Sequence, residues 1–167
     1  MEVRLASGLQ KDSIVDGSGI RTVIWFQGCL HHCYMCHNPE TWDLNGGIVF
    51  DLDDIKEEIK NLKYQSGITL SGGDPFFQAE SATEIAKYAH ECNLNVWCYT
   101  GYTIEQLENR HDSITDECLS QINVLVDGRF ENEKKSLACK FRGSTNQRII
   151  DVPKSIEQGD IVLLYED

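Results

Sequence analysis

The sequence predicts an α/β fold in which a parallel sheet forms part of a barrel. Segments typical of strands alternate with segments typical of helices, and this order implies right-handed crossovers between parallel strands. A full eight-fold barrel usually takes about 200 residues or more, whereas this chain has 167. We therefore expect an open, TIM-like partial barrel, built as one domain over residues 1–167.

Composition and charge exclude several classes of protein. The chain is 41% hydrophobic and 25% charged, which is ordinary for a globular protein. Its 15 basic and 27 acidic residues give a net charge of −12, which argues against a nucleic-acid partner. No apolar run approaches the roughly 20 residues that a membrane helix requires. We expect no membrane partner and a cytoplasmic location.

The first predicted strand spans residues 22–26, where β-branched and aromatic residues follow one another, as in a strand buried on both faces. Before it, the glycines of residues 16–21 indicate a turn. Directly after it comes a loop that holds three cysteines, Cys29, Cys33 and Cys36.

The middle of the chain alternates helix and strand. Asp51 is a suitable N-cap for a helix whose apolar side chains recur at residues 55, 59 and 62. A strand at 67–70 then runs into Ser71-Gly72-Gly73-Asp74, and a second helix places residues 82, 85, 86, 89 and 92 on its buried side. The third strand, at 95–99, ends in Thr100 and Gly101.

The last third of the chain has weaker patterns. Thr103 is expected to cap a short helix, and a second short helix is expected around residues 116–120. The fourth strand, at 123–126, ends in Asp127 and Gly128. Residues 131–146 are polar without a clear period, and we predict two short closing strands at 147–150 and 161–165.

Chemically unusual residues follow the predicted strands at the point where each strand ends. They are the three-cysteine loop, residues 71–74, residues 99–101 and residues 127–128. In barrel-like α/β folds the carboxyl ends of parallel strands meet at one edge, where sites are built. The sequence therefore predicts one site at this edge.

Several chemistries compete for the cysteine loop. Disulfides fit poorly, because the chain has seven cysteines and its N-terminus lacks the pattern of a secretory signal, so we expect a reducing compartment. Haem attachment at residues 33–37 would need export, a thioredoxin-like pair leaves Cys29 unexplained, and structural zinc needs four ligands. Three clustered thiolates suit a [4Fe–4S] cluster with one iron open to a ligand. Zinc and haem stay open as less favoured alternatives.

The spacing Cys29-x3-Cys33-x2-Cys36 resembles the pattern of the radical S-adenosylmethionine enzymes. The resemblance implies a [4Fe–4S] cluster bound by these three catalytic cysteines, with S-adenosylmethionine on the open iron. One electron would then cleave the S–C5′ bond and yield a 5′-deoxyadenosyl radical. In that family a stretch similar to Gly72-Gly73-Asp74 holds the methionine amino group. A carboxylate beside glycines suits this task, since glycine permits close approach and the carboxylate accepts from an ammonium group.

Further cofactor contacts are expected at the same edge. Met35 and His37 are candidates for adenine contact, Thr100 follows the third strand, and Asp127 is a candidate for the ribose hydroxyls or the methionine amine. Asp127 has a structural alternative, a turn with Gly128. His31 and His32 are expected to be solvent-exposed loop residues.

Three later stretches resemble the small activases of glycyl radical enzymes, most closely those of anaerobic ribonucleoside-triphosphate reductase. They are residues 97–102, 123–128 and 142–148, and the resemblance covers residues 14–150. It implies a glycyl radical subunit as partner and a one-electron donor such as a flavodoxin. Two alternatives stay open: an activase of the pyruvate formate-lyase type, and a radical enzyme that acts on a small molecule.

Overall fold

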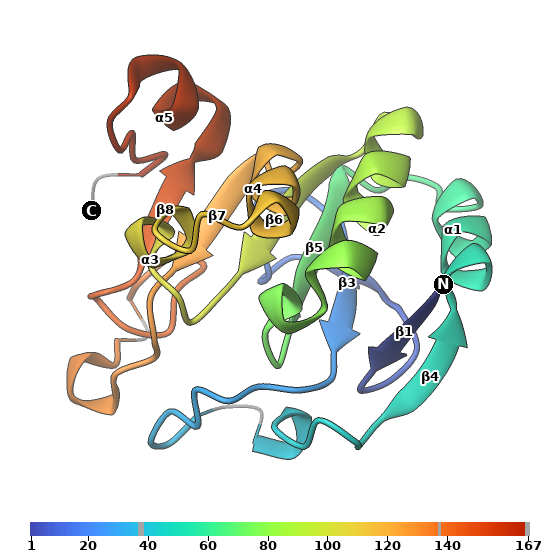
Figure 1. Cartoon of the computed structure of the whole chain (residues 1–167), viewed down its shortest axis with the longest axis horizontal. Helices are drawn as coiled ribbons and strands as arrows, with labels where there is room; N and C mark the ends of the chain where they lie inside the picture. Colours follow the sequence, from blue (N-terminus) through green and yellow to red (C-terminus); the bar gives the residue numbers. More distant parts are fainter. Residues whose placement is uncertain (37–38, 137, 166–167) are drawn as a thin grey trace.

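The computed structural model describes residues 1–36, 39–136 and 138–165, and it is built on an eight-stranded sheet (Figure 1). The strand order is β4-β1-β3-β5-β6-β7-β8, and β2 pairs with β3 outside this path. The strands are β1 (Glu2–Leu5), β2 (Gln10–Ser13), β3 (Arg21–Phe26), β4 (Ile48–Asp51), β5 (Gly67–Gly72), β6 (Asn95–Tyr99), β7 (Val124–Asp127) and β8 (Arg148–Asp151).

The centre of the sheet confirms the predicted parallel arrangement. The four strands β3, β5, β6 and β7 run parallel to one another. The margins are antiparallel, since β1 pairs antiparallel with β3 and β4, and β8 pairs antiparallel with β7. The two ends of the path, β4 and β8, do not pair with each other among the described residues, so the sheet is an open partial barrel.

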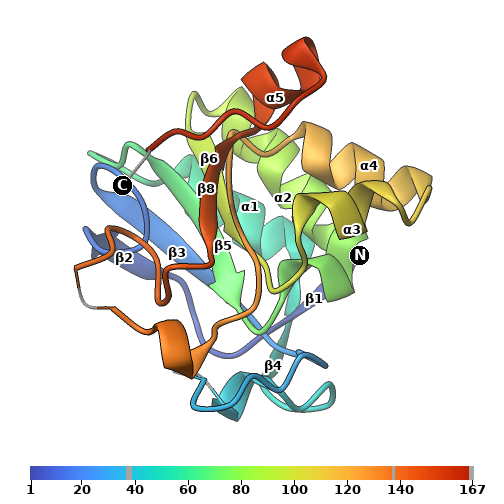
Figure 2. The ribbon, with the colours of Figure 1, turned by 90° about the vertical axis from the view of Figure 1, so that its left-hand side faces the viewer.

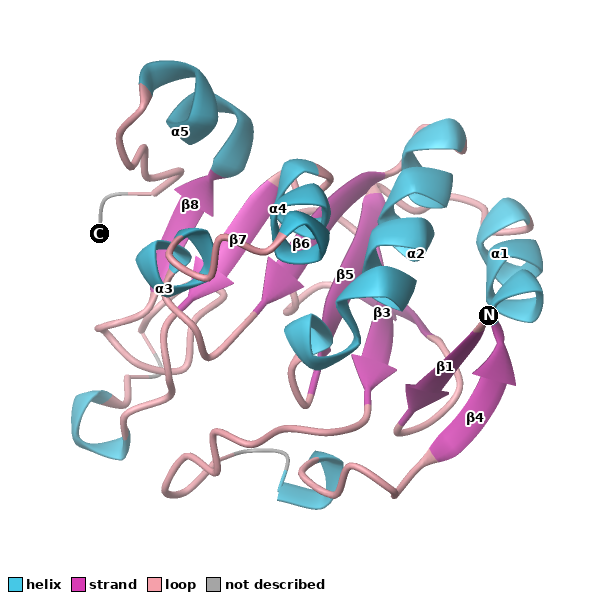
Figure 3. Ribbon diagram, viewed as in Figure 1, coloured by secondary structure: helices cyan, strands magenta, loops and turns pink. Residues whose placement is uncertain are grey.

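The helices lie mainly on one face of the sheet, as Figures 1 and 2 show. They are α1 (Leu52–Lys60), α2 (Ala79–Glu91), α3 (Ile104–Glu108), α4 (Ser113–Ser120) and α5 (Val152–Gln158). The main core forms where α1 to α4 bury apolar side chains against the sheet, with Ile24, Leu70 and Leu125 fully buried in it. Figure 3 shows that loops gather at the lower end, where the arrowheads of β3, β5, β6 and β7 point.

The opposite face of the sheet carries a second, smaller cluster. Trp97, Val124 and Val126 are buried there, and Phe141 and Tyr165 pack against them. Side chains alternate between faces along a strand. Trp97 therefore belongs to this cluster while its neighbour Cys98 belongs to the main core. We call this second face the inner face of the sheet. The loops that follow β2 and β7 cover it.

Two of the predicted helix starts are confirmed in detail. The carboxylate of Asp51 accepts a hydrogen bond from the Asp53 amide at the start of α1. Thr103 and Gln106 form a capping box at the start of α3. These local signals work because cap and helix are adjacent in sequence.

Several element predictions were wrong. Residues 161–165 contact β8 through an isolated bridge at Leu163 and are not a named strand. Helix α5 was not predicted, although Asp151 caps it and Gly159 ends it in a left-handed conformation. α4 begins at Ser113, earlier than predicted, because Asp112 caps it. β1, β2 and β4 were missed, since each has only four residues, and β1 and β4 pair with each other although they lie far apart in sequence.

Candidate functional site

The cysteine loop and the Gly72-Gly73-Asp74 stretch are joined by backbone hydrogen bonds at the carboxyl end of β3. The Gly73 amide donates to the Phe26 carbonyl at 2.8 Å, and the Asp74 amide donates to the Gly28 carbonyl at 2.9 Å. On the other side, the Gly28 amide donates to the Thr41 carbonyl at 2.6 Å. The predicted meeting of these two motifs at one sheet edge is what the structure shows.

Gly72 is required by this close approach. Its φ is +98°, and a Cβ there would lie 2.4 Å from the Phe26 carbonyl oxygen. A side chain in the left-handed region is strained, and here it would also collide with backbone. The glycine therefore lets β5 end directly against the strand that carries the cysteines.

The carboxylate of Asp74 is fully buried and surrounded by donors. The amide of Phe76 donates to Oδ1 at 3.0 Å, and the amide of Gly101 donates to Oδ2 at 2.9 Å. The Thr100 hydroxyl lies 3.0 and 2.8 Å from the two oxygens. Two of the predicted cofactor residues, Asp74 and Thr100, are thus in direct contact.

The prediction for His31 was wrong. We expected a solvent-exposed loop residue, but its side chain is only 4% exposed, and its Nε2 lies 2.7 Å from Asp74 Oδ2. An ionised carboxylate only accepts hydrogen bonds, so Nε2 is the donor. The imidazole is buried because Asp74, at the end of β5, offers an acceptor next to the rings of Phe77 and Tyr102. His32 is exposed as expected, and its ring stacks on Trp42 at 4.5 Å.

Cys29 is buried in this loop, and Cys33 and Cys36 are half-buried. Burial raises the pKa of Cys29 to about 11, and the nearby Asp74 charge also raises it, while backbone amides of His31 and His32 act in the opposite direction. Burial also raises the pKa of Cys33, against the effect of the Phe130 amide. The loop is closed in part by the Cys36 amide, which donates to the Cys33 carbonyl at 3.1 Å.

These thiols fit an iron–sulfur cluster by the chemistry of the donor set. Backbone amides face two of the sulfurs, as they do where thiolates hold Fe–S clusters and tune them through hydrogen bonds. Within residues 1–36, 39–136 and 138–165, however, no group of three His, Cys, Asp or Glu side chains stands at metal-ligand spacing. That spacing is the spacing of ligands around one metal ion, whereas each cysteine of a [4Fe–4S] cluster binds a different iron.

The backbone of the cysteine loop is strained at two positions. His32 has φ +49° and Met35 has φ +61°, a region that side-chain-bearing residues rarely adopt. Such conformations persist when the surroundings impose them, and they cluster at functional sites. Met35 is 60% exposed, so its side chain is open to a ligand. His37, the other expected adenine contact, lies outside the described residues.

Asp127 stands at the same sheet edge but makes structural contacts. Its carboxylate, 1% exposed, accepts from the Ile104 amide at 2.9 Å and from Nε and Nη2 of Arg148, at 3.0 and 2.5 Å. Arg148 also pairs with Glu105. These contacts give the Asp127 carboxylate a structural role, through Ile104 and Arg148 and not through the turn with Gly128 that the sequence suggested.

Sequence reasoning missed two residues of the site, His31 and Arg148. His31 lies between two of the cysteines, which was a signal that its side chain could face the site. Arg148 lies in the predicted strand at 147–150, and nothing local indicates that it reaches Asp127, 21 positions earlier in the chain.

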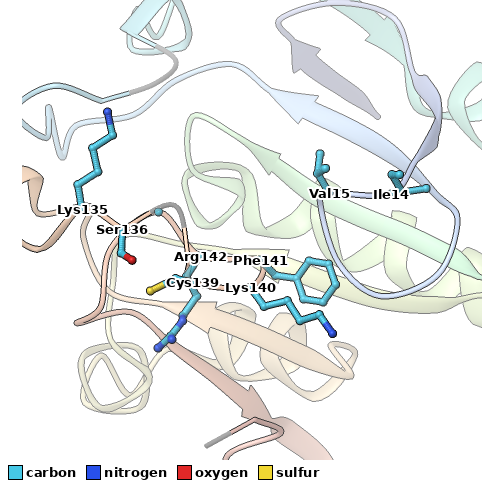
Figure 4. A pocket seen from close by; sticks show the side chains of 9 residues that line it. Ile14, Val15, Lys135, Ser136, Cys139, Lys140, Phe141 and Arg142 are labelled. Atoms are coloured by element: carbon cyan, nitrogen blue, oxygen red, sulfur yellow. The ribbon is translucent and has the colours of Figure 1, made fainter. Parts of the chain in front are cut away.

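A cavity of about 550 Å³ opens on the inner face of the sheet, between the loop after β2 and the loop after β7 (Figure 4). Ile14, Val15 and Phe141 supply apolar surface, and Lys135, Lys140 and Arg142 supply positive charge. Ile14 and Val15 are about 70% exposed. Among the residues that the structure describes, none of the predicted cofactor residues lines this cavity.

Across the described residues, no helix is both long and apolar enough to span a membrane.

Comparison with known families gives a match over most of the chain. Residues 15–150 match the family model of the 4Fe-4S single cluster domain. An anaerobic ribonucleoside-triphosphate reductase-activating protein of Pasteurella multocida is 36% identical over 147 residues, which are 81% of this chain and 90% of that protein. Proteins of the same name from Enterobacteria phage T4 and Escherichia coli K12 are 34% and 35% identical, covering 81% and 80% of this chain and 86% and 90% of theirs.

Among solved structures, QueE from Escherichia coli has a similar fold. The TM-score is 0.50 at 14% identity, over 61% of this chain and 54% of QueE, so the chain spans about half of that protein. This neighbour supports the partial-barrel fold, and the family match over residues 15–150 confirms the predicted [4Fe–4S] cluster. The chain belongs to the family of the anaerobic ribonucleoside-triphosphate reductase-activating proteins.

Proposed function

We propose that this chain activates an anaerobic ribonucleotide reductase by generating a glycyl radical on it. The observation that carries this function is the contact between two motifs: the Asp74 amide donates to the Gly28 carbonyl, directly before Cys29. This contact places a three-thiol loop beside a glycine-lined carboxylate. The three thiols can bind a cluster, and the carboxylate can bind the amino group of an amino-acid ligand.

Each residue has a role in this proposal. Cys29, Cys33 and Cys36 bind the cluster and leave one iron for the ligand. Gly72, Gly73 and Asp74 hold the methionine amine, and Thr100 orients the Asp74 carboxylate through its hydroxyl. We expect Met35, Cys36 and His37 to contact the adenosine, and Asp127 to bind the ribose hydroxyls or the methionine amine.

The bound cluster and S-adenosylmethionine together supply reductive cleavage and a 5′-deoxyadenosyl radical that takes a hydrogen atom from glycine. The residues of the chain position the bound groups and shield them from water. Asp74 provides a buried negative charge for a cationic amine, and a buried charge attracts its partner more strongly than an exposed one. The amides that face Cys29 and Cys33 stabilise thiolate over thiol.

The partner in this proposal is the glycyl radical subunit of the reductase. Its glycine-bearing segment would approach along the open inner face of the sheet, where the cavity between the two loops offers apolar and basic side chains. We further propose a one-electron donor of the flavodoxin kind, a cytoplasmic location, and a single working domain over residues 1–167.

The test is anaerobic incubation of the reconstituted, reduced chain with S-adenosylmethionine and a reductase of this class. The proposal predicts a glycyl radical signal by electron paramagnetic resonance and one 5′-deoxyadenosine per radical. A signal with a pyruvate formate-lyase instead would reassign the partner. Formation of 5′-deoxyadenosine with a modified small molecule and no protein radical would reassign the reaction.

A further inference from the structure

The Asp74 carboxylate has no acceptor position left for another ligand. A carboxylate offers about four acceptor positions. Four donors occupy them: the amides of Phe76 and Gly101, the hydroxyl of Thr100, and Nε2 of His31. An incoming ammonium group can bind Asp74 only if one of these donors leaves.

Three of the four donors are fixed parts of the sheet edge. The Phe76 amide belongs to the turn that follows Asp74, and Thr100 and Gly101 directly follow β6. The two amides cannot move without breaking the ends of buried strands, and the Thr100 hydroxyl is held by the Tyr102 amide, which donates to it at 3.2 Å. His31 is the exception, because it is a loop residue between Cys29 and Cys33, and its imidazole can leave Asp74 without breaking a strand.

The imidazole of His31 sits in a slot shaped for a ring. A Cβ on Gly101 would lie 2.5 Å from Cδ2 and 2.8 Å from Nε2 of that ring. The Tyr102 ring packs edge-on against it with centroids 4.6 Å apart, and the Phe77 ring lies 5.6 Å away. The absence of a side chain at Gly101 thus makes room for His31 on Asp74.

We propose that His31 is a latch that occupies the amine-binding carboxylate of the S-adenosylmethionine site until the ligand displaces it, and this rests on the function proposed above. The imidazole holds Asp74 Oδ2 until an ammonium group replaces it. A ligand with the amino group regains a charge-assisted hydrogen bond for the one it displaces. A nucleoside without an amino group has no donor that could replace the imidazole, so the hydrogen bond between His31 and Asp74 stays in place.

The test measures ligand affinity for the cluster-loaded, oxidised chain under anaerobic conditions. The two probes are S-adenosylmethionine and 5′-methylthioadenosine, which lacks the amino acid moiety. His31→Ala removes the displacement cost, so S-adenosylmethionine should bind about tenfold tighter or more, from the strength of a hydrogen bond to a charged group. The affinity for 5′-methylthioadenosine should not change.

A second variant also removes the hydrogen bond between His31 and Asp74, without a substitution in the cysteine loop. Gly101→Ala pushes the imidazole off Asp74 and should also tighten binding of S-adenosylmethionine alone. His32→Ala is the matched control, because His32 stacks on Trp42 and does not touch Asp74. It should leave both affinities at their wild-type values.

The outcomes separate this inference from the proposed function. If His31→Ala binds S-adenosylmethionine as the wild type does or more weakly, or loses its cluster, His31 anchors the loop and the latch is wrong. If wild-type chain with its cluster does not bind S-adenosylmethionine at all, the proposed function itself fails.

Discussion

His31 Nε2 lies 2.7 Å from Asp74 Oδ2, although 43 residues separate the two in the chain. This pair connects the cysteine loop after β3 to the turn after β5. Both side chains are almost completely buried, so the contact is made away from water, where a hydrogen bond to a charged group is strongest. The two halves of the site are therefore joined by side chains as well as by backbone.

Replacing Asp74 with asparagine should abolish the attraction for a cationic amine. Asp74→Asn keeps the shape but removes the negative charge, so we expect binding of S-adenosylmethionine to weaken about tenfold or more. Calorimetry on cluster-loaded protein measures this. Asp16→Asn is the control, since Asp16 accepts from Ser13 Oγ before β3 and should not affect binding. Equal affinities in Asp74→Asn and wild type would show that Asp74 does not hold the amine.

Gly72→Ala should destabilise the fold strongly. The new Cβ would sit in a left-handed conformation, 2.4 Å from the Phe26 carbonyl oxygen, and we expect a loss of about 2 kcal/mol or more in unfolding free energy. Urea denaturation followed by circular dichroism measures it. The comparison is Gly8→Ala, where no atom lies within 4 Å of the added Cβ and the change should stay within about 0.5 kcal/mol. Similar denaturation midpoints for both variants would mean that β5 can end without the left-handed backbone conformation at residue 72.

Arg148→Ala should leave a buried charge on Asp127 without its cation. Asp127 is 1% exposed, and breaking a buried pair costs about 3 kcal/mol or more. Glu105→Ala removes the other partner of Arg148, but Glu105 is 53% exposed, so its loss should cost less than about 1 kcal/mol. Unfolding free energies of the two variants, measured side by side, decide this. Equal small losses would indicate that Asp127 finds another partner, such as solvent.

Stability should fall at high pH because of a buried thiol. Burial raises the pKa of Cys118 from 9.0 to about 12, so the folded chain keeps a proton that the unfolded chain releases above pH 9. The stabilisation is complete below pH 9 and is lost as the pH rises toward 12. This thiol alone should contribute a slope of up to about 1.4 kcal/mol per pH unit.

The measurement for this thiol is the unfolding free energy at a series of pH values under reducing conditions. Cys118→Ala should reduce the slope above pH 9, and Cys98, whose pKa is also raised by burial, should account for part of what remains. Identical slopes in the variant and the wild type would show that Cys118 does not stay protonated in the folded chain.

The sequence predicted the centre of the fold because its signals are local. Residues 22–26 and 95–99 are continuous apolar runs, and Asp51 and Thr103 are caps next to their helices, so each could be identified from its neighbours. The antiparallel margins could not. β4 has mostly exposed side chains and becomes a strand only by pairing with β1, far away in sequence.

The site was predicted in part for the same reason. Cys29, Asp74 and Thr100 each follow a recognisable strand, so the rule for parallel sheets places them together. The partners of those residues could not be predicted. That His31 turns inward onto Asp74, and that Arg148 reaches Asp127, depends on the register of strands and on the space left by Gly101.

The most direct test of a three-cysteine cluster with an open iron is electron paramagnetic resonance of the anaerobically reconstituted, dithionite-reduced chain. Spectra are recorded before and after addition of S-adenosylmethionine, with Cys36→Ser and Cys92→Ser as paired variants. We predict a [4Fe–4S]⁺ signal that changes shape on addition in the wild type and in Cys92→Ser, and its loss in Cys36→Ser. A wild-type chain that binds zinc and gives no cluster signal would contradict the catalytic account.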